Sequence, residues 1–85
     1  MADVIVTFKV MPTGVDVDLD RLEVEIKEAV KADRIKREPI AFGLVALHVT
    51  KIIPDAGGVL DEIEQKLKKI EGVGEIEVVE LTRTL

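Results

Sequence analysis

Residues 59–81 read VLDEIEQKLKKIEGVGEIEVVEL, and within this segment the hydrophobic period changes from that of a helix to that of a strand. The first part carries apolar residues three or four positions apart, at Leu60, Ile63, Leu67 and Ile70, with acids early and lysines late, which predicts an amphipathic helix. Gly72 stands where a left-handed C-terminal cap is expected. Glu75–Leu81 then predict a strand, with a bulge near Val78-Val79 where the alternation breaks.

The first half of the chain has the same strand-then-helix order. Every second residue from Val4 to Val10 is apolar, which predicts a strand that ends at Met11–Gly14. Three acids, Asp16, Asp18 and Asp20, lead into a second segment with helical spacing. Its apolar residues are Leu19, Leu22, Ile26, Ala29 and Val30.

Two further strands are predicted in the middle of the chain. Arg34–Glu38 is short and charged and is followed by Pro39, which indicates an edge strand or an extended arm. Phe42–Ile53 is apolar without clean alternation, as expected of a central strand. With right-handed crossovers, the order strand, helix, strand, strand, helix, strand predicts an α+β fold. It is the ferredoxin-like βαββαβ sandwich, a four-stranded antiparallel sheet with two helices on one face.

The composition restricts the possible chemistry. Eighty-five residues, 47% of them hydrophobic and 34% charged, predict a single domain over residues 1–85. The chain has no Cys, Ser or Asn and only one His, His48, so it offers no thiolate metal site, only one histidine ligand, and no set of nucleophile, base and orienting group. We therefore expect no catalytic residues, no cofactor and no covalent chemistry.

The net charge of −5 argues against anionic partners. It repels nucleic acid and anionic lipid. An RNA-binding module would need several exposed aromatics, whereas Phe42 is the only aromatic in residues 40–45 and Phe8 is predicted to face the helices. The apolar runs are too short to cross a bilayer, and no basic region precedes an apolar one at the N-terminus, so we expect a cytoplasmic protein.

Three other groups have both a functional and a structural interpretation. Gly57-Gly58 ahead of a helix could cradle a phosphate, but the following acids oppose an anion and favour a simple turn. His48 in an apolar strand is better interpreted as a partly buried sheet histidine than as a catalytic one. The last group, Glu75, Glu77 and Glu80, is better interpreted as a solvated strand edge than as paired catalytic carboxylates.

Three segments together resemble the translation elongation factor 1-beta family, in particular its short archaeal members. They are Met11-Pro12 with the acids that follow it, the stretch Pro39–Leu47 with its Pro-x-x-Phe-Gly pattern, and Ile70–Val73. The resemblance covers the whole chain. It implies a guanine-nucleotide exchange factor that binds the GTPase elongation factor 1-alpha and opens its nucleotide and magnesium site.

The resemblance also implies partner-binding residues. Phe42 matches an aromatic implicated in partner contact, and Pro39 and Gly43 shape its segment. Eukaryotic members carry a Lys just before the last residue that reaches the magnesium and phosphate region. Here Thr84 holds that place and Arg83, one residue earlier, is the nearest cation. Phe42 also has a structural interpretation as a core residue of the central strand, and Arg83 has one as a solvated tail cation.

The alternative function is a small ferredoxin-like regulatory or oligomerisation domain, which binds an amino acid or pairs edge strands with its own copy. A turn such as Gly72-Val73 fits that class equally well. The Pro39–Leu47 segment favours the exchange family, because a sensor domain has no evident use for it. No extended hydrophobic edge is present in the sequence, so we expect a monomer.

Overall fold

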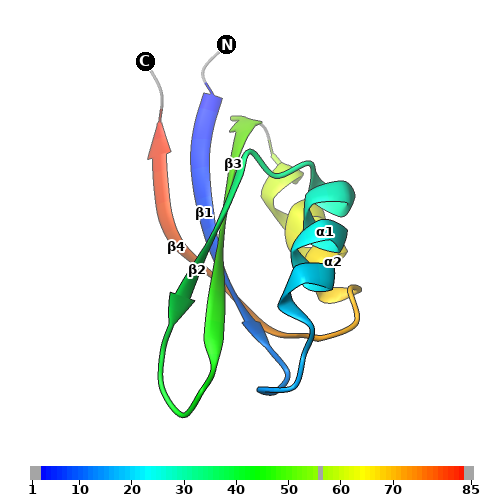
Figure 1. Ribbon diagram of the computed structural model, residues 1–85. Helices are drawn as coiled ribbons and strands as arrows, with labels where there is room; N and C mark the ends of the chain where they lie inside the picture. The colour runs from blue at the N-terminus through cyan, green and yellow to red at the C-terminus, as the bar shows by residue number, and fades with distance from the viewer. Residues whose placement is uncertain (1–2, 56, 84–85) are drawn as a thin grey trace.

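The computed structural model describes residues 3–55 and 57–83 and contains the predicted order of helices and strands. Within these residues four strands form one antiparallel sheet, and both helices lie on the same side of it (Figure 1). This confirms the ferredoxin-like fold. The elements are β1 (Asp3–Pro12), α1 (Leu19–Val30), β2 (Arg34–Pro39), β3 (Val45–Pro54), α2 (Val59–Lys68) and β4 (Val73–Arg83).

The sheet order is β2-β3-β1-β4, so β1 and β3 are central and β2 and β4 are edge strands. Every second residue of β1 is buried towards the helices, and Phe8 is completely buried there, as predicted. Complete burial of such a side chain contributes about 1.5–3 kcal/mol relative to exposure. The core comprises Val4, Val6, Phe8, Val10, Leu22, Ile26, Val30, Ala32, Leu47, Val49, Ile53, Ile63 and Leu67.

The predicted start of the central strand at Phe42 is wrong, because β3 begins at Val45. Phe42 and Gly43 have φ angles of 55° and 81°, which lie in the left-handed region and are incompatible with a strand backbone. Residues 40–44 instead form the loop of a β2–β3 hairpin. The loop is closed by the Ile40 N–H, which donates to the Leu44 carbonyl at 2.9 Å.

The predicted helix cap at Gly72 is also wrong. Helix α2 ends at Lys68, and its C-cap is Lys69 in a right-handed conformation. Gly72 does have a left-handed φ of 101°, but it lies in the turn between α2 and β4. Its carbonyl accepts a hydrogen bond from the Thr13 N–H at 2.9 Å, so the turn is joined to the end of β1.

The predicted bulge in the last strand is confirmed. Thr7 pairs with Glu80 and Phe8 pairs with Val78, which leaves Val79 as an extra residue in β4. Because side chains alternate between the two faces of a sheet, the extra residue changes the face of every residue after it. Arg83 therefore lies opposite Val4, on the side of the sheet that the helices cover.

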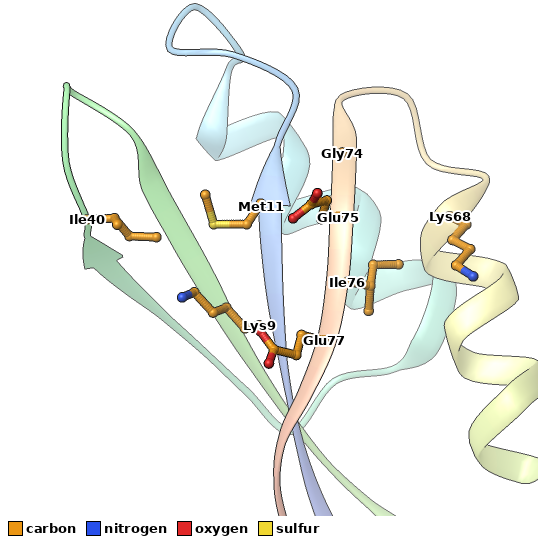
Figure 2. Close-up of a pocket in the computed structure, with 8 residues that line it drawn as sticks. All are labelled: Lys9, Met11, Ile40, Lys68, Gly74, Glu75, Ile76 and Glu77. Atoms are coloured by element: carbon orange, nitrogen blue, oxygen red, sulfur yellow. The ribbon is translucent and has the colours of Figure 1, made fainter.

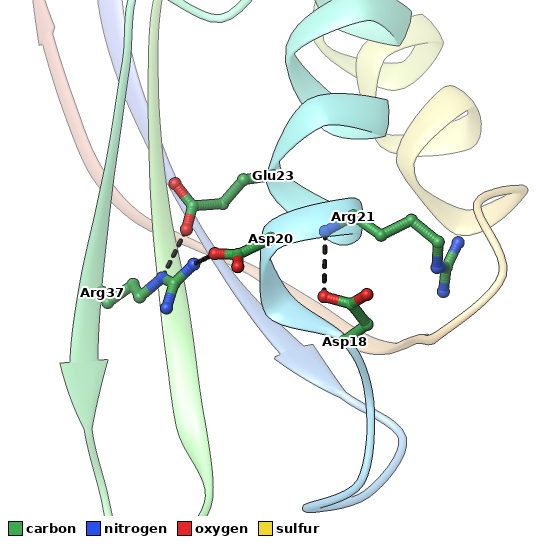
Figure 3. Close-up of polar contacts among 5 residues, drawn as sticks. All are labelled: Asp18, Asp20, Arg21, Glu23 and Arg37. Carbon is green, nitrogen blue, oxygen red and sulfur yellow. Dashed lines mark hydrogen bonds and ion pairs between the residues drawn. The ribbon is translucent and has the colours of Figure 1, made fainter.

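An ion-pair network joins edge strand β2 to the start of α1 (Figure 3). Arg37 contacts the carboxylates of Glu23 and Asp20. The hydrogen bond to Glu23, and then that to Asp20, raise the pKa of Arg37 above its usual value. Asp18 is the N-cap of the helix, where its carboxylate accepts a hydrogen bond from the Arg21 N–H at 3.2 Å. The network holds the strand that precedes the β2–β3 loop.

Candidate functional site

The β2–β3 loop presents a single aromatic side chain to solvent. Phe42 is 96% exposed. Its backbone is left-handed, which costs a bulky residue roughly 1–2 kcal/mol. The interpretation of Phe42 as a core residue is therefore wrong. A phenylalanine that is both strained and solvated contributes nothing to the core, and such a residue is typical of a binding anchor.

The neighbours of Phe42 fix the shape of the loop. Pro39 is the last residue of β2 and pairs with Val45. The Leu44 N–H donates to the Ala41 carbonyl at 3.0 Å, so Phe42 lies inside a tight turn. Gly43, at φ 81°, occupies a backbone conformation that other residues rarely adopt. Pro39 and Gly43 therefore define the ends of this turn, and a part for either of them in partner binding stays a prediction.

The other predicted partner-binding residue, Arg83, lies at the end of β4. Its side chain is 73% exposed, and its Nη1 lies 3.7 Å from Oδ2 of Asp55. An exposed ion pair of this kind contributes about 0–1 kcal/mol, so a stronger anionic site can readily displace Asp55. Sequence reasoning did not identify Asp55, because it is distant in sequence and only the fold brings the two side chains together. Thr84 lies outside the described residues.

The β2–β3 loop, which carries Phe42, and the end of β4, which carries Arg83, lie at opposite ends of the molecule, whose longest extent is 41 Å (Figure 1). Arg83 pairs with Val4 of β1, and Val4 pairs in turn with Ile53 near the end of β3. The loop that carries Phe42 precedes Val45, which is the first residue of β3. At about 3.3 Å per residue, the strand from Val45 to Ile53 alone separates them by roughly 26 Å. The two predicted contacts therefore do not form one pocket, and they can only reach two separate parts of a large partner.

A surface depression of about 570 Å³ lies elsewhere (Figure 2). It wraps around the edge of β4 and carries charges of both signs, including Lys9 opposite Glu77. Neither Phe42 nor Arg83 lines it. A depression that is open on two sides of an edge strand and lacks a buried polar group has no evident ligand.

The structural interpretations of the three other groups agree with the geometry. Gly58 is the N-cap of α2 with a left-handed φ of 86°, as a turn glycine is. His48 is partly buried in β3, with Nε2 at 3.5 Å from Oε1 of Glu38. The acidic residues of the last group are all exposed on edge strand β4: Glu75, Glu77 and Glu80.

The described residues contain neither a metal-binding cluster nor a membrane-spanning helix. Within residues 3–55 and 57–83, no cluster of three His, Cys, Asp or Glu side chains is placed to hold a metal ion. In the same part of the chain, neither helix is long and apolar enough to cross a membrane. The exposed aromatic and the exposed cation at the two ends therefore remain the strongest functional features.

Comparison with known proteins gives a consistent result. The family described as EF-1 guanine nucleotide exchange domain matches residues 5–84. A protein named Elongation factor 1-beta from Methanothermobacter thermautotrophicus is 46% identical, and the match covers all of both chains. Another protein of that name, from Methanoculleus marisnigri, is 45% identical over 96% of this chain and 98% of its own length.

Proposed function

Since the chain belongs to the EF-1 guanine nucleotide exchange domain family and is a translation elongation factor with a nucleotide-exchange role, we propose that its partner is elongation factor 1-alpha. It binds this GTPase and opens the nucleotide and magnesium site, so that GDP leaves and GTP enters. No bond in the nucleotide is made or broken. We further propose that residues 1–85 act as one monomeric exchange domain.

The mechanism is thermodynamic linkage. A protein that binds the open form of a GTPase more tightly than the closed form must lower the nucleotide affinity by the same factor. Each tenfold change corresponds to about 1.4 kcal/mol of differential binding. An interface of standard size supplies several kcal/mol, so a domain of this size is sufficient.

The separation of Phe42 and Arg83 supports a two-point mechanism. Phe42 anchors the domain on one part of the GTPase, and Arg83 reaches the magnesium and phosphate region from the other end of the sheet. A guanidinium placed there competes with the magnesium ion and phosphate contacts electrostatically. The rigid sheet between the two points transmits the binding energy of the anchor to the nucleotide site.

The observation that carries the proposal is Phe42, 96% exposed in a left-handed backbone. The test measures release of fluorescent GDP from the cognate elongation factor 1-alpha at subsaturating amounts of this protein. We expect Phe42→Ala to lower the acceleration about 30-fold, since loss of an aromatic anchor typically costs 2 kcal/mol or more.

The matched control is Val24→Ala, which truncates an exposed apolar residue of α1 (56% exposed) away from both ends. It should behave as the unaltered protein does. Thermal melting followed by circular dichroism checks that both variants are folded. If the unaltered protein does not accelerate GDP release, the proposed function is wrong. If the unaltered protein accelerates GDP release and Phe42→Ala does so equally well, exchange stands and the anchor is wrong.

A further inference from the structure

The β1–α1 loop lies at the same end of the molecule as the β2–β3 loop (Figure 1). The two loops are neighbours at Gly43, where an added Cβ atom would lie 3.6 Å from Cγ1 of Val15. A methyl group of Val15 therefore packs beside the backbone of the residue that follows Phe42. The two loops come from distant parts of the sequence and meet only through the fold.

Val15 is itself 66% exposed, although its side chain is apolar. It belongs neither to the core nor to the partly buried side chains packed against the core. Val15 and Phe42 are the two most exposed of the large apolar side chains that are exposed in the described chain. Two such side chains lie in neighbouring loops, and exposed apolar side chains gathered at one end of a molecule are typical of a protein interface.

We propose that Val15 and Phe42 together form one docking surface, the loop-end patch, which enters an apolar pocket with a basic rim on the GTPase. This inference rests on the proposed function and adds a second contact residue from a second loop. Val15 covers the glycine that allows the turn, so it supports the strained backbone and contacts the partner at the same time.

The charge around the loop-end patch indicates which charge the rim of the partner's pocket carries. Asp16, next to Val15, is exposed, and Asp18 at the helix N-cap is exposed as well. Residues 13–18 contain no Lys or Arg, and because the Asp18 carboxylate caps α1, Asp16 is the carboxylate of this loop that is left to face a partner. A partner pocket rimmed by Lys or Arg is complementary to such a patch, and exposed rim charges act mainly on the rate of association.

The test is a double-mutant cycle on binding to elongation factor 1-alpha, with Val15→Thr, Phe42→Leu and the double variant. Threonine keeps the shape of valine and replaces one methyl by a hydroxyl. We expect Val15→Thr alone to weaken binding about fivefold, and the double variant to lose less than the product of the single losses, because neighbouring contacts are not additive. The control Val24→Thr, on the exposed face of α1, should change affinity less than twofold.

A second arm uses Asp16→Asn, which should slow association severalfold at low salt and leave dissociation unchanged. Thermal melting checks that each variant is folded. If the unaltered protein binds and accelerates exchange while Val15→Thr matches Val24→Thr, the loop-end patch is wrong and the proposed function stands. If the unaltered protein does neither, the proposed function fails first. Sedimentation showing a dimer that Val15→Thr dissociates would make a second copy the occupant and overturn the proposal.

Discussion

The two ends of the molecule hold their exposed side chains in different ways. At the loop end, Phe42 is fixed by hydrogen bonds within residues 40–44 and by a left-handed backbone. At the other end, Arg83 is a long side chain with one exposed ion pair, at 3.7 Å, to Asp55. A short aromatic side chain on a hydrogen-bonded loop loses less entropy on binding than a long flexible cation, whereas the flexible cation can follow a target that moves. The difference suits an anchor at one end and an electrostatic probe at the other.

The largest expected effect comes from removing both ends together. Residues this far apart with no shared partner normally have additive effects on free energy. If Phe42→Ala costs about 30-fold and Arg83→Ala about tenfold, the double variant should lose roughly 300-fold in exchange efficiency. The measurement is GDP release against protein concentration for both single variants and the double variant. A double variant no worse than Phe42→Ala would mean that the two ends are not independent contacts.

A pair of deletions in β4 tests whether the face occupied by Arg83 matters. Deleting Val79 removes the bulge and leaves Arg83 opposite Val4, whereas deleting Thr82 moves Arg83 opposite Ile5, on the uncovered face. We expect the Thr82 deletion to lower exchange about tenfold, like Arg83→Ala, and the Val79 deletion to lower it less than threefold.

Both deletions remove one residue from the same edge strand, so each controls for the shortened chain. Amide exchange along β1 establishes that the sheet is retained. Equal activity of the two deletion variants would show that the face occupied by Arg83 is irrelevant.

The smallest expected effect is at the ion-pair network that holds β2. Arg37→Gln removes the contacts to Asp20 and Glu23, and solvent-exposed ion pairs of this kind add little to stability. The midpoint of thermal unfolding should fall by a few degrees at most, and exchange should change less than twofold. Arg34→Gln, on the same strand but facing away from α1, is the control and should not shift the midpoint. A loss of exchange as large as that of Phe42→Ala would mean that the network positions the loop directly.

The fold was predictable because the repeating apolar positions are local signals. The spacing of Leu60, Ile63 and Leu67 identified a helix, and the break in alternation at Val78-Val79 identified the bulge. The start of β3 was not predictable in the same way. Phe42 is apolar like the strand that follows, and only its backbone angle separates it from that strand.

The candidate site was predictable only in its parts. The resemblance identified Phe42 and Arg83, but nothing in the sequence around either residue indicates how far apart the two lie in the fold. The partners of each are set by the fold, because Val15 meets Gly43 and Asp55 meets Arg83 across long sequence separations. Contacts between loops leave no periodicity in the sequence, so they appear only in three dimensions.

The chain has two aromatic rings, and the fold places them in opposite surroundings. Phe8 is fully buried at the centre of the sheet, and Phe42 is almost fully solvated. In an NMR spectrum the ring of Phe8 should shift the nearby methyl signals strongly, whereas the ring signals of Phe42 should resemble those of a free peptide. The NMR signals of each ring can therefore be followed without an added label. Phe8 reports whether the protein is folded, and Phe42 reports whether its loop is occupied.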